Sequence, residues 1–76
     1  MGEVHADGEM WSAALWQARQ AIGNAVTADS IIVDAQFDFT PGIGFHDAAL
    51  KTIAAAGANT KAAAAFRTAF TQRGFL

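Results

Sequence analysis

The residues best suited to chemistry lie close together near the N-terminus, where His5, Asp7 and Glu9 follow one another at every second position. A histidine can donate a hydrogen bond or exchange a proton near neutral pH, which suits it to stabilising charge that develops during a reaction. His5 and Glu9 are four residues apart, so a helix would also place them on one face as two metal ligands. A catalytic zinc site needs three protein ligands, and nothing else converges on this pair, so we predict no metal site within this chain.

The second histidine, His46, precedes Asp47 at the start of a predicted helix. Negative charge is favourable in the first turn of a helix, so Asp47 supports a helix start here. We interpret His46 as a surface residue at this helix start, with no chemical role. Cysteine is absent, which excludes a disulfide framework and a thiolate metal site.

The composition favours a small helical domain. The chain has 76 residues, enough for one domain, and 53% of them are hydrophobic, but nineteen of these are alanines, which form helices well and bury little area. We therefore expect burial to depend on the large apolar side chains: Trp11, Leu15, Trp16, Ile22, Ile31, Ile32, Phe37, Phe39, Phe45, Leu50, Ile53, Phe66 and Phe70.

Charge is divided unevenly along the chain. Residues 1–47 hold all seven acidic residues and one basic residue, Arg19, whereas residues 48–76 hold four bases and no acid. The net charge is −2 and no nucleic-acid-binding motif is present, so we predict no nucleic-acid binding. No apolar run approaches the roughly 20 residues that span a bilayer, and we predict no membrane partner.

The apolar spacing predicts a first helix over residues 8–22, with Asp7 as N-cap and Gly23-Asn24 as the stop. Residues 28–39 are ambiguous, because their alternation fits a strand and Ala28, Ile31, Ile32, Ala35 and Phe39 also form a helical stripe. A lone strand could not satisfy its backbone groups, so we predict a helix that ends at Thr40-Pro41.

Two further helices are expected over residues 46–56 and 61–73. The first of them should turn Ala49, Leu50 and Ile53 inward behind an anchoring Phe45, and should stop at Gly57. Asn59 or Thr60 should cap the second, which should end at Gly74. The sequence therefore predicts an all-α array of four helices forming a single domain over residues 1–76.

Residues 2–11, Gly-Glu-Val-His-Ala-Asp-Gly-Glu-Met-Trp, followed by a helix rich in Ala, Leu and Trp, resemble the C-terminal domain of fungalysin-type zinc metallopeptidases, relatives of thermolysin. The resemblance continues at Ala35-Gln36-Phe37, at Thr40-Pro41 with the following Phe45, and at residues 69–74, Ala-Phe-Thr-Gln-Arg-Gly. It thus spans nearly the whole chain, and its Val-His-x-x-Gly-Glu-x-Trp element is its most specific part.

In that family zinc is held by a His-Glu-x-x-His helix and a downstream Glu, all of which precede the helical region. This sequence has no His-Glu-x-x-His. The resemblance matches His5 to the histidine that donates a hydrogen bond to the developing oxyanion. The acidic residue that orients this histidine, five positions earlier, falls outside the 76 residues. We expect His5 to lie on a frayed tail in the isolated chain and to take the oxyanion role in a longer parent.

The resemblance therefore implies the C-terminal helical domain of a secreted, extracellular metalloendopeptidase. Such a domain would form one wall of the cleft, with the N-terminal zinc-binding domain and a peptide substrate as its partners, and would be inactive alone. Zinc would belong to the full-length parent. The alternative from the residues alone is an autonomous helical interaction module, because the apolar surface exceeds what four short helices need.

Overall fold

Helices account for most of the chain. The computed structural model describes the backbone of residues 2–76 and the side chains of residues 8–76. Its helices are α1 (Gly2–Ile22), α2 (Ala25–Phe37), α3 (Phe45–Ala55) and α4 (Thr60–Gln72), and residues 2–76 contain no strand. The predicted all-α fold of four helices is confirmed, and the ambiguous segment 28–39 is helical as far as Phe37.

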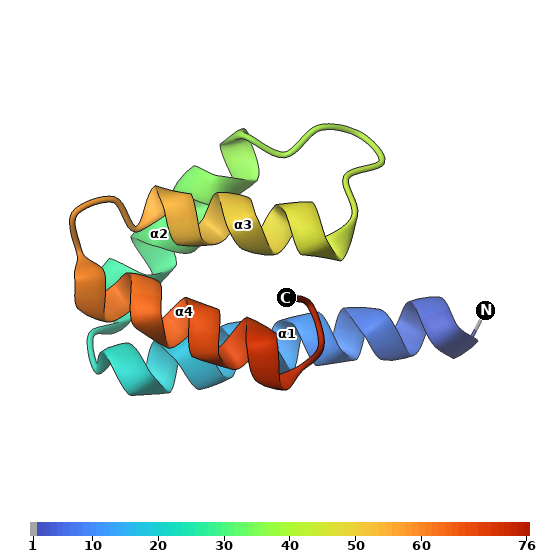
Figure 1. The fold of residues 1–76 in the computed structure, drawn as a ribbon, viewed down its shortest axis with the longest axis horizontal. Helices are drawn as coiled ribbons and strands as arrows, with labels where there is room; N and C mark the ends of the chain where they lie inside the picture. The colour runs from blue at the N-terminus through green and yellow to red at the C-terminus, as the bar shows by residue number, and fades with distance from the viewer. Residues whose placement is uncertain (1) are drawn as a thin grey trace.

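The helices form a closed ring of neighbours around one core. Helix α1 contacts α2 and α4, and α3 contacts the same two helices. Figure 1 shows α4 beside α1 and α3 beside α2, with the N-terminal turns of α1 projecting beyond the other three helices. The described N-terminal end of α1 is therefore available to a partner outside this domain.

Asparagine side chains set the starts of α2 and α4. The Oδ1 atom of Asn24 accepts a hydrogen bond from the backbone N–H of Thr27 at 3.0 Å, and Asn59 accepts one from Ala62 at the same distance. Each cap satisfies a backbone donor that the helix itself cannot pair. Of the two caps proposed for α4, Asn59 is thus the one used.

Alanine lines the contacts between the helices. Small side chains let helix backbones approach closely, so a thin core can still close around its two fully buried phenylalanines, Phe66 and Phe70. The polar Thr52 is also buried, and its Oγ1 donates to the carbonyl of Ala48 at 2.8 Å. The buried alanines are Ala14, Ala18, Ala28, Ala35, Ala48, Ala49, Ala56, Ala62 and Ala69.

The end of α4 turns the chain back into the core. Gly74 adopts a φ of 79°, which L side chains rarely adopt, and the N–H of Phe75 donates to the carbonyl of Phe70 at 2.9 Å. This is the Schellman pattern that ends a helix. It buries Phe75, whose ring lies 5.5 Å from Trp11 and 5.1 Å from Phe45.

The predicted start of the first helix was wrong. Helix α1 begins at Gly2, so the Asp7 backbone lies within the helix and Asp7 is not its N-cap. Neither Pro nor Gly occurs from Glu3 to Asp7, so the backbone can continue the helix through these residues. The Asp7 side chain lies outside the described side chains.

Four residues expected in the core are instead exposed. The exposed fractions are 58% for Trp16, 84% for Phe37, 37% for Phe45 and 42% for Leu50. In α3 the inward face is shifted so that Ala48, Ala49 and Thr52 are buried in place of Leu50. The small core has room for alanines along this contact, and the larger side chains remain on the surface.

Candidate functional site

The sequence-predicted site residue, His5, belongs to the first turns of α1. Its backbone is helical, although the sequence predicts a helix only from residue 8. Its side chain lies outside the described residues 8–76, as do any contacts that it makes. The helix nevertheless fixes which described residues share a face with position 5.

Position 5 shares a face of α1 with Trp16. The two positions are eleven residues apart, which in a helix of 3.6 residues per turn is a rotation of only about 20° and a rise of about 16 Å. Trp11 lies about 140° from Trp16 around the same helix. Trp11 therefore faces the core, as predicted, while Trp16 is exposed on the face that carries position 5.

Trp11 fixes the N-terminal half of α1 to the rest of the domain. Its ring is stacked on Phe70 with centroids 4.9 Å apart and planes inclined by 10°. It also contacts Phe45, whose centroid is 5.5 Å away, so the predicted anchoring role of Phe45 is confirmed. These contacts hold the face of α1 that includes Trp16 and position 5 in a set orientation to the core.

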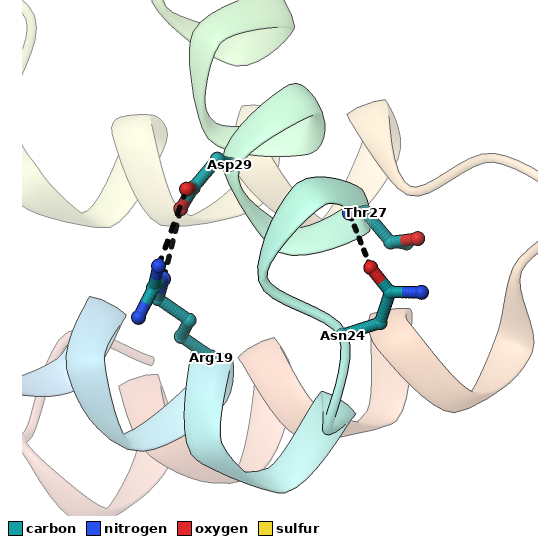
Figure 2. Close-up of polar contacts among 4 residues, drawn as sticks. All are labelled: Arg19, Asn24, Thr27 and Asp29. Carbon is teal, nitrogen blue, oxygen red and sulfur yellow. Dashed lines mark hydrogen bonds and ion pairs between the residues drawn. The ribbon is translucent and has the colours of Figure 1, made fainter.

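The Arg19 side chain connects Trp16 with α2. The Arg19 guanidinium lies 5.4 Å from the Trp16 ring centroid, and its Nε is 3.0 Å from Oδ1 of Asp29. Figure 2 shows the Arg19 and Asp29 side chains meeting across the gap between α1 and α2, with the Asn24–Thr27 cap beside them. The exposed face of α1 is therefore continuous with the outer surface of α2.

His46 has a structural contact that the sequence did not indicate. It lies in the first turn of α3, on the surface as predicted, and its Nδ1 is 2.9 Å from the carbonyl oxygen of Phe75. A carbonyl oxygen only accepts, so Nδ1–H is the donor. The bond ties the returning C-terminal segment to α3.

The described side chains do not assemble a metal centre. Within residues 8–76 no group of three His, Cys, Asp or Glu residues is placed to hold an ion. Of the possible metal-ligand pair His5 and Glu9, the structure describes only the Glu9 side chain, because the His5 side chain is outside that range. No described helix combines the length and apolarity needed to cross a bilayer.

Three open hollows are lined by described side chains. One is bounded by the loop 40–44 and by Asp47, Leu50 and Lys51 of α3. Another lies along α2 between Val26, Asp29, Val33 and Asp34, and a third lies beside Val33, Gln36 and Phe37. The hollow beside Asp29 adjoins the Arg19–Asp29 pair.

Sequence reasoning missed Phe75 and the surface of α2. Gly74 was identified as a helix stop, and an apolar residue directly after such a glycine is a known companion of the Schellman turn, so this signal could have found Phe75. The α2 surface gave no such signal, because apolar residues lie on two sides of that helix and their pattern does not tell which side faces inward. Only the packing distinguishes its inner residues from its outer ones.

No protein-family model matches the chain, and comparisons with curated proteins and with solved structures also give no match.

Proposed function

We propose that the chain is the C-terminal helical domain of a secreted zinc metalloendopeptidase of the fungalysin type. In the parent enzyme it would form one wall of the active-site cleft, and His5 would donate a hydrogen bond to the oxyanion of the tetrahedral intermediate. The motif at residues 2–11 motivates this proposal. A donor aimed at charge that forms only in the transition state contributes on the order of 10²–10³ in rate.

The observation that carries the proposal is the exposure of Trp16 on the face of α1 that includes position 5. Trp16 leaves 58% of its surface in water, so this large apolar side chain contributes little buried area to a domain with a small core. A second domain seated on this face would cover Trp16 and would bring its own residues beside position 5. The projecting N-terminal turns of α1 in Figure 1 leave this approach open.

The described residues do not fit a zinc ion, since they offer no group of three ligands. The metal and the general base would therefore belong to the zinc-binding half of the parent, and this chain would contribute His5 and the cleft wall. The chain alone should neither bind zinc tightly nor hydrolyse peptides.

Two observations test this division of roles. The coding sequence upstream of Met1 should encode, in frame, a His-Glu-x-x-His helix followed by a glutamate. Calorimetric titration of the 76-residue chain with zinc should give no stoichiometric sub-micromolar binding. Tight binding of one zinc ion, or peptide hydrolysis by the zinc-loaded chain, would refute the proposal.

One observation favours the alternative, an autonomous helical interaction module. The caps at Asn24 and Asn59 and the return of Phe75 close the domain with its own residues. Such a domain can fold alone and bind a partner through its exposed apolar residues. An upstream sequence without His-Glu-x-x-His would favour this alternative over the peptidase.

A further inference from the structure

We draw no further inference here: the strongest candidate, the exposed apolar patch that Val26, Val33 and Phe37 form on the outer surface of α2, carries no proposal because nothing in the structure shows what covers it.

Discussion

Trp11 is stacked on Phe70 with ring centroids 4.9 Å apart, and this contact joins the first helix to the last. Trp11→Ala should lower the free energy of unfolding by about 3–5 kcal/mol, the usual loss for a core aromatic. A domain of this size has only roughly 3–5 kcal/mol in total, so the variant should be largely unfolded at room temperature. Far-UV circular dichroism in a urea titration measures the change.

Trp16→Ala is the matched control for Trp11. The same side chain is removed from the surface of the same helix, where only the contact with Arg19 is lost. The free energy of unfolding should change by less than about 1 kcal/mol. Equal losses in the two variants would show that the assignment of core and surface faces to α1 is wrong.

Two glycines should respond in opposite directions to alanine. Gly74 has a φ of 79° and Gly8 lies inside α1, and a Cβ atom at either position would meet nothing within 4 Å. Gly74→Ala should therefore cost about 1–2 kcal/mol of backbone strain, whereas Gly8→Ala should stabilise α1 by up to about 1 kcal/mol. Thermal unfolding of the pair measures both. Stabilisation by Gly74→Ala would contradict the left-handed turn that returns Phe75 to the core.

Asn59→Ala should lower the free energy of unfolding by about 1 kcal/mol, because the N–H of Ala62 loses its acceptor. Thr60→Ala should change it little, since Thr60 is the first residue of α4 and Asn59 is the cap. Urea titrations of the two variants compare the positions directly. A larger loss in Thr60→Ala would assign the cap to Thr60.

The pair formed by Arg19 and Asp29 should contribute modestly to stability. Both side chains are partly exposed, with 33% and 56% of their surface in water, so solvent screens the attraction. A double-mutant cycle of Arg19→Gln and Asp29→Asn should give a coupling of about 0.2–1 kcal/mol that shrinks in added salt. Coupling that does not depend on salt would indicate that the pair acts through packing.

The sequence predicted the helices well because each has a local signal. Alanine content favours helices throughout, Gly57 and Gly74 end two of them, and Asn59 caps one. The start of α1 was missed because Asp7 has the side chain of a good N-cap, and nothing local shows that the helix continues back to Gly2. Local propensity identifies helices better than it places their ends.

Burial was less predictable than helicity. Trp16, Phe37 and Leu50 are apolar and lie in helices, but the choice between inner and outer faces depends on how the helices are rotated against one another. Phe75 was missed because its burial follows from a turn two residues from the end of the chain. The role proposed for His5 rests on the motif alone, and the fold adds only that position 5 lies about 20° from the exposed Trp16 around α1.

The most direct test of the peptidase proposal is peptide hydrolysis by this chain combined with the polypeptide encoded immediately upstream of it. Hydrolysis should require both parts. His5→Ala should lower kcat by about 10²–10³ without changing the zinc content, and His46→Gln, the control at the other histidine, should not change kcat. Full activity of the His5→Ala variant, or of the upstream polypeptide alone, would contradict the role proposed for His5.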